Sequence, residues 1–190
     1  MDRSPVSLCE TLAERYQALL EVAQAISSHR DLDDLFREIA QRLPRVVRVN
    51  FVGLSLYDPI KNMMRLHTVQ ANVPADLVGG HEESIDETPA GLVWQTQEPL
   101  LVPNVADETR WPKVMRCMQE DNSRSFCFVP LTTGARRLGA MGFVSLEKEA
   151  YSEADLEFLR QFVLELRDLL KRQCILHRDG NRIRHLLQEF

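Results

Sequence analysis

No run in the 190-residue sequence approaches the roughly 20 consecutive apolar residues of a membrane-spanning helix. The opening residues, Met-Asp-Arg-Ser-Pro, lack the basic and then apolar segments of a secretory signal. A basic excess is missing too, because the formal net charge is -5. Binding to a nucleic acid duplex needs a concentrated basic face. We therefore expect a cytoplasmic protein, with no membrane contact and no direct nucleic acid binding by this region.

Cysteines are few and lie far apart. Cys9, Cys117, Cys127 and Cys174 form no Cys-x-x-Cys pair, so the sequence indicates neither a zinc knuckle nor a disulfide framework. Buried, reduced thiols are the favoured interpretation. Since Cys117 and Cys127 flank a predicted loop, a redox pair formed by these two stays open as an alternative.

Sequence patterns that carry catalysis are absent as well. His67 and His81 stand in no His-x-x-x-His or Ser/His/Asp arrangement, and no Gly-x-x-x-x-Gly-Lys loop is present to hold a nucleotide phosphate. Asp107, Glu108 and Cys117 have no spacing that requires a metal. We expect no catalytic residue and no metal site, and hence a protein that is not an enzyme.

What is present is a strongly patterned globular sequence, 44% hydrophobic and 27% charged, long enough for one domain with a core. Apolar residues at three- and four-residue spacings predict amphipathic helices over residues 8–28 and 31–43. Alternating apolar residues then predict strands over 51–57 and 63–71, joined by turn residues at 58–62. The second pair of elements is therefore a hairpin.

The middle of the chain, residues 72–124, is rich in proline and contains a Gly-Gly pair, so long elements are not expected there. Within it we predict a short helix over 89–97, started by Thr88 and Pro89, a brief strand over 100–102 and a helix over 111–120. A loop-rich insertion of this size is where small domains place a binding surface.

The last third begins with two more alternating strands, residues 126–131 and 138–146. Ser152, with Asp155 three residues later, predicts the start of a capped helix. The order of strand, polar turn, glycine-punctuated strand and capped amphipathic helix is typical of a small α/β sensor module.

The final long helix carries apolar residues at alternating three- and four-residue steps, the spacing of a helix pair. Its early turns must cover the domain's own sheet, whereas from Leu166 onward packing on that sheet and self-association with a second copy both stay open. With the amino-terminal helix included, the candidate dimer contacts are Leu12, Leu19, Ile26, Val163, Leu166 and Leu170.

Beyond Cys174 the pattern breaks at a turn, residues 179–181, and a new amphipathic helix starts near Ile183. We therefore divide the chain into a flexible N-terminus over residues 1–9, a single domain over 10–174, and a linker or the start of a following domain's helix over 175–190.

These fragments, taken in this order, resemble the GAF domain family. The resemblance covers about residues 12–174 and rests on the two leading helices and on five stretches: the strand at 50–58, the helix-to-strand passage at 91–104, and the segments 128–131, 138–144 and 151–159. The chain looks most like the N-terminal GAF modules of bacterial sigma-54-dependent transcriptional regulators of the formate-hydrogenlyase-activator type.

The resemblance implies an α+β fold, an α/β/α sandwich related to PAS domains. A central antiparallel sheet of five or six strands would carry the N- and C-terminal helices on one face and a ligand pocket under the loops of the other. The candidate pocket residues are Leu54, Leu66, Trp94, Trp111, Met115, Phe128 and Phe143. For each of them an ordinary core position is the favoured interpretation, because apolar side chains are usually inside for packing reasons.

Three chemistries known in this family are not matched. The order Lys61-Asn62 departs from the cyclic-nucleotide pattern, and Cys117 is followed by Met118 where bilin-binding members commonly have histidine. Residues 92–93 are leucine and valine where the free-methionine-sulfoxide reductases need a cysteine. The sequence therefore identifies no cofactor.

As a function, the resemblance implies a non-catalytic sensory module. It would bind a small-molecule ligand, form a homodimer, and relay the state of the ligand site through its terminal helices to a downstream effector, a transcriptional activator. Two alternatives remain: a ligand-free dimerisation scaffold, and a thiol redox enzyme that uses Cys117 and Cys127.

Overall fold

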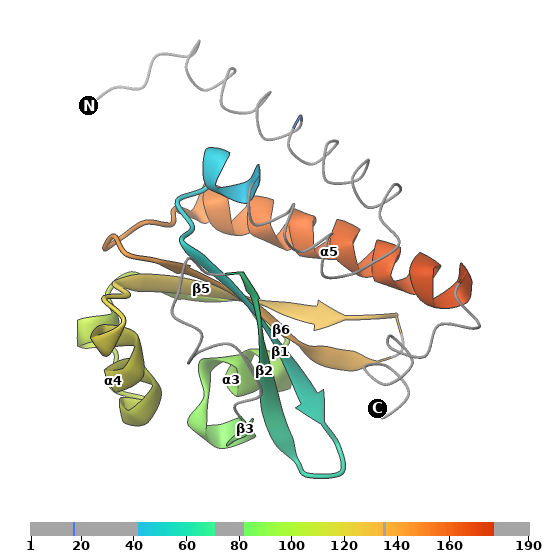
Figure 1. Cartoon of the computed structure of the whole chain (residues 1–190), viewed down its shortest axis with the longest axis horizontal. Coiled ribbons are helices and arrows are strands. Elements are labelled where there is room, and N and C mark those ends of the chain that lie inside the picture. The colour runs from blue at the N-terminus through green and yellow to red at the C-terminus, as the bar shows by residue number, and fades with distance from the viewer. Residues whose placement is uncertain (1–16, 18–41, 71–81, 135, 177–190) are drawn as a thin grey trace.

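The computed structural model describes residue 17 and residues 42–70, 82–134 and 136–176, with only the backbone for 67–70 and 168–176. The predicted helices over 8–28 and 31–43 fall almost wholly outside this part. In chain order the elements (Figure 1) are η1 (Leu43–Arg45), β1 (Phe51–Asp58), β2 (Met63–Gln70), β3 (Glu82–Ser84), η3 (Ile85–Glu87), α3 (Pro89–Thr96), β4 (Leu100–Val102), η4 (Val105–Asp107), α4 (Pro112–Glu120), β5 (Ser125–Thr132), β6 (Arg137–Ser145) and α5 (Glu153–Leu176).

One antiparallel sheet contains the six described strands in the order β3-β2-β1-β6-β5-β4. The central pair, β1 and β6, runs in register from Phe51 opposite Val144 to Leu56 opposite Gly139. Both edge strands are only three residues long, which limits pairing with another chain. The predicted α+β fold with an antiparallel sheet of five or six strands is confirmed.

The two faces of the sheet are covered differently. The helix α5 runs across one face, above the sheet in Figure 1, and α3 and α4 lie below it. Along β1, Val52, Leu54 and Leu56 belong to the core under α5. Gly53 and Ser55 therefore point to the other face, because side chains alternate along a strand. We call the two faces the α5 side and the loop side.

The larger hydrophobic core lies on the α5 side. Phe162 of α5 meets Phe143 of β6 edge to face, with 6.2 Å between ring centroids. Val163 and Leu166 are 2% and 0% exposed and pack in the same core. The prediction that these two residues form dimer contacts is corrected, because their own sheet already buries them. The other predicted dimer contacts, Leu12, Leu19, Ile26 and the Leu170 side chain, lie outside the described residues.

Local sequence explains where the helices start and stop. The Thr88 hydroxyl accepts a hydrogen bond from the Gly91 amide at 2.9 Å and caps α3. Ahead of α5, Asp155 accepts from the Ser152 amide at 2.9 Å and from its hydroxyl at 2.6 Å, so the predicted cap is confirmed. The longest described helix, α5, has 24 residues; in the part of the chain described here, no helix is long and apolar enough to cross a membrane.

Candidate functional site

Four small residues lie together in the middle of the loop side. In the register of the central pair, Gly53 is opposite Gly142 and Ser55 is opposite Ala140. Neighbouring strands lie about 4.8 Å apart and alternate residues of one strand about 6.8 Å apart, so these positions cover roughly 5 by 7 Å. We call Gly53, Ser55, Ala140 and Gly142 the small-residue block.

Two larger side chains, from the strands that flank the central pair, cover part of the block. Phe128 of β5 is the register partner of Gly142, and a Cβ built on that glycine would lie 2.7 Å from Cε1 of the phenylalanine ring. Leu66 of β2 is the partner of Ser55, and its Cδ1 would lie 3.2 Å from a Cβ built on Gly53. The atoms that approach both glycines are therefore the ends of side chains and not backbone.

Ser55 is the polar member of the block and is 6% exposed. Among the described buried hydroxyls, Thr88 accepts from the Gly91 amide and Ser125 donates to the Glu147 carbonyl at 2.6 Å, whereas the Tyr151 hydroxyl, in the core under α5, has no partner. Within the described residues, no hydrogen bond engages the Ser55 hydroxyl. The Ser55 side chain thus presents on the loop side a hydroxyl that no described residue hydrogen-bonds; it is not among the fully buried unpaired side-chain atoms, of which the described residues hold Tyr151 Oη.

A second hydrophobic core surrounds the block. This loop-side cluster consists of Met64, Ile85, Ala90, Val93, Val102, Val105, Trp111, Met115, Phe126, Phe128 and Ala140. Trp111 is held from outside by the Arg110 guanidinium, 4.4 Å from its ring centroid. Arg110 in turn pairs with Glu108 at 2.6 Å and lowers the pKa of that carboxyl group by hydrogen bonding. The Trp111 ring, at the start of α4, is therefore held in position by the ion pair of Arg110 and Glu108.

Trp94 of α3 is joined to two hairpins. Its ring stacks on Tyr57 of β1 with 4.0 Å between centroids and 31° between planes. Its indole Nε1 donates to the Arg137 carbonyl at 3.1 Å, and the Arg137 guanidinium donates back to the Gln95 carbonyl at 2.8 Å. A further hydrogen bond runs from the Thr132 hydroxyl to the Gln97 side chain. The carboxyl end of α3 is thereby attached to both ends of the β5–β6 turn.

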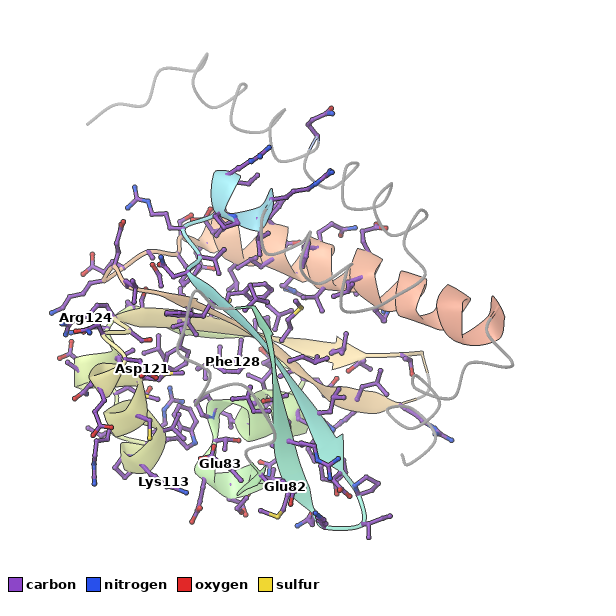
Figure 2. The ribbon with its side chains drawn as sticks, viewed as in Figure 1. Glu82, Glu83, Lys113, Asp121, Arg124 and Phe128 are labelled. Carbon is purple, nitrogen blue, oxygen red and sulfur yellow. The ribbon has the colours of Figure 1, made fainter. Side chains whose placement is uncertain are left out.

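Charged side chains along β3 occur in pairs on both faces of the sheet, because Glu83 lies opposite Met64 of the loop-side cluster and Glu82 lies opposite Arg65. Lys113 of α4 lies 3.8 Å from Glu83 of β3, and the two are neighbours in Figure 2. On the α5 side, where Arg65 is the register partner of Leu56, Glu82 accepts hydrogen bonds from Lys61 and Arg65, each at 2.8 Å. These bonds, with the one from Lys61 contributing most, lower the pKa of Glu82 below its usual value. The cations here are already matched by carboxylates of the same chain.

The structure separates the seven predicted pocket residues into two groups. Trp94, Trp111, Met115 and Phe128 belong to the loop-side cluster or pack against it, and Leu66 reaches the small-residue block. By contrast, the other two belong to the core under α5. For Leu54 and Phe143 the predicted place on the loop side is corrected, because strand alternation turns both side chains toward α5.

Sequence reasoning overlooked the small-residue block itself. The signal was available, because Gly53 and Ser55 alternate with the apolar Leu54 and Leu56 in one strand, and Ala140 and Gly142 alternate with Met141 in another. What the sequence did not provide was the register that sets the four positions side by side.

The two described thiols lie on opposite sides of the sheet. Cys127 belongs to the core under α5 and is fully buried, which raises its pKa to about 12. Cys117 is exposed on α4, at the loop side. The interpretation of these two as a redox pair is corrected, because the sheet separates them. Among the described residues, no group of three or more His, Cys, Asp or Glu side chains is arranged to hold a metal ion.

A family model described as "GAF domain" matches residues 29–170. Among curated proteins, the formate hydrogenlyase transcriptional activator of Salmonella typhimurium (strain LT2) is 24% identical over 157 residues, which is 78% of this chain and 22% of that protein. The DNA-binding transcriptional activator HyfR of Escherichia coli (strain K12) is 22% identical over 161 residues, 80% of this chain and 23% of that protein. The chain thus spans less than a quarter of the length of these relatives.

Solved structures share the fold at low identity. The GAF domain of a phosphoenolpyruvate-protein phosphotransferase from Coxiella burnetii superposes with a TM-score of 0.73 at 17% identity, covering 86% of this chain and 96% of that one. A free methionine-R-sulfoxide reductase from Neisseria meningitidis, in complex with its substrate, gives 0.70 at 17% identity, covering 85% and 91%. One architecture therefore serves both a domain of a phosphotransferase and a reductase.

Proposed function

Since the chain belongs to the GAF domain family, we propose that it is a regulatory module that binds a small-molecule ligand on the loop side of its sheet. The module would relay the state of this ligand site to a downstream effector, which we take to be a sigma-54-dependent transcriptional activator. The relatives that carry a similar segment are transcriptional activators more than four times as long as the segment they share. We infer no catalysis by this module and propose that it acts in the cytoplasm of a bacterium.

One observation carries the proposal of a ligand site. The centre of the loop side holds the small-residue block, where the hydroxyl of the 6% exposed Ser55 has no hydrogen bond to a described residue, inside an otherwise apolar cluster. Small-molecule sites in proteins are mostly apolar, with a few placed polar groups that set orientation. The part of the loop-side cluster that fits this description best is the block with Phe128 and Leu66.

A route for the relay follows from the sheet. The strands β1 and β6 present the block on one face and the residues that pack under α5 on the other, and α5 follows β6 in the chain. A ligand that favours one arrangement of these strands would shift the equilibrium between two positions of α5. The size of that shift is limited by the difference in the ligand's affinity for the two states. We propose that the terminal helices also form the homodimer through which the shift reaches the effector.

Native mass spectrometry of the freshly purified protein, compared with its denatured mass, tests ligand binding. We expect additional mass that disappears on denaturation. Gly53→Leu fills the block and is expected to abolish the added mass, whereas Gly134→Leu is the matched control, because a Cβ built on Gly134 has no atom within 4 Å. A folded wild-type protein without added mass, and with no stabilisation by cell extract, would overturn the proposal.

A second candidate function is a dimerisation scaffold that has no ligand. The observation in its favour is that Phe128 and Leu66 already lie over the two glycines, so the chain's own side chains occupy part of the block. The scaffold predicts equal stability of Gly53→Leu with and without cell extract, together with a stable dimer.

A further inference from the structure

The chemistry of the block also restricts what kind of molecule it can bind. Resting on the ligand site proposed above, we propose that the ligand is uncharged, carries a flat group the size of one six-membered ring, and forms a hydrogen bond with the Ser55 hydroxyl. It would lie on the small-residue block, between Phe128 and Leu66.

Size is the first argument. The block covers roughly 5 by 7 Å of the sheet surface, which is close to the outline of a single six-membered ring. Gly53 and Gly142 lack side chains, so a planar group can approach the backbone of both central strands once the two covering side chains shift. Phe128 offers an aromatic face to such a group from the flanking strand, at the centre of the sheet in Figure 2.

Charge is the second argument. The residues of the loop-side cluster are all uncharged, and burying an ion without a partner is strongly unfavourable. On the loop side Lys113 is already paired with Glu83, and both are labelled in Figure 2. A carboxylate on the block would therefore not find Lys113 free, and its negative charge would oppose that of Glu83.

Hydrogen bonding is the third argument. Ser55 is 6% exposed, and its hydroxyl has no bond to any described residue. A hydroxyl can donate one hydrogen bond and accept others, so it matches an amide, a hydroxyl or a ring nitrogen on the ligand. A purely apolar ligand would leave the Ser55 hydroxyl buried and unsatisfied, which disfavours that class.

The test compares benzamide with benzoate, a neutral and an anionic probe of nearly the same shape, by titration into ¹⁵N-labelled protein at pH 7.5. Probes of this size bind with Kd values on the order of 1 mM. We expect benzamide to shift the amide resonances of Gly53, Ser55 and Gly142 in a saturable way, with at least about tenfold weaker binding of benzoate. In Ser55→Ala the benzamide affinity is expected to fall about two- to tenfold, while Ser123→Ala, another buried serine, leaves it unchanged.

Each outcome decides between the two proposals. If benzoate binds at the same residues as tightly as benzamide, the uncharged class is overturned and the ligand site stands. Equal benzamide affinity in wild type and Ser55→Ala overturns the role of the hydroxyl. If neither probe shifts these resonances at about 10 mM, the block is not a binding site, and the ligand site of the proposed function fails with it.

Discussion

At Gly139 the two central strands approach so closely that no side chain fits between them. A Cβ built there would lie 1.9 Å from the Ser55 carbonyl oxygen, which is backbone and cannot move aside. We expect Gly139→Ala to lower the free energy of unfolding by about 3 kcal/mol. Gly134→Ala is the control and should change it by less than about 0.5 kcal/mol, because its Cβ position is open. Urea denaturation measures both, and equal stabilities would contradict the strand geometry.

The two thiols should differ sharply in reactivity. Burial, with a smaller effect of the Asp155 charge, raises the pKa of Cys127 to about 12, so at pH 8 only about one in ten thousand of these groups is the reactive thiolate. Cys117 is exposed. With Cys9 and Cys174 replaced by serine, we expect iodoacetamide at pH 8 to modify one thiol in the native protein and two in denaturant. Rapid native modification of Cys127 would contradict its burial.

Among elements, α3 depends on the contact between Trp94 and Tyr57. Stacked aromatic pairs add about 1 kcal/mol beyond the area they bury. In a double-mutant cycle of Trp94→Leu and Tyr57→Leu, we expect a coupling energy of that size from urea denaturation. The cycle of Trp94→Leu with Leu164→Ala, a change on the exposed side of α5, should be additive within about 0.5 kcal/mol. No coupling in the first cycle would mean that the stack does not stabilise α3.

The attachment of β3 to the hairpin should depend on pH. Hydrogen bonds from Lys61 and Arg65 lower the pKa of Glu82 below 4.5. The stability that Glu82 contributes is therefore fully present above about pH 4.5, and it is lost as the pH falls through the lowered folded value. We expect Glu82→Gln to lower the Tm at pH 7, and the difference from wild type to disappear toward about pH 3. Glu98→Gln is the exposed control, and a difference that persists at low pH would contradict the ion pairs.

For the whole molecule, the central question is whether α5 belongs to one protomer or to a dimer. Leu166 is 0% exposed and packs on its own sheet, whereas Leu164 is 42% exposed. We expect Leu166→Ala to cost about 2–5 kcal/mol of unfolding free energy, with a drop in Tm that does not depend on protein concentration. Leu164→Ala should cost less than about 0.5 kcal/mol. If the effect of Leu166→Ala vanishes on dilution, the residue contributes to a dimer.

Regular alternation and capping made most of the described fold predictable from the sequence. The strands β1, β5 and β6, the short helices α3 and α4, and the cap of α5 at Ser152 all follow from local patterns that the tertiary structure does not override. Leu54 and Phe143 were misplaced for a different reason. The resemblance to a family indicated which strands line the loop side. The face of the sheet to which a side chain points depends instead on whether its residue is at an odd or an even position in the strand.

By itself, then, the sequence determined the class of fold, the order of its elements and the absence of a catalytic pattern, because these depend on spacing within short windows. Only the tertiary structure decided the rest. It placed Gly53 and Ser55 next to Gly142 and Ala140, which lie more than 80 positions away in the chain, and it put the sheet between Cys117 and Cys127. It also placed Val163 and Leu166 in the core. Strand register and helix packing bring together residues that are far apart in the chain, and a local sequence pattern does not show such contacts.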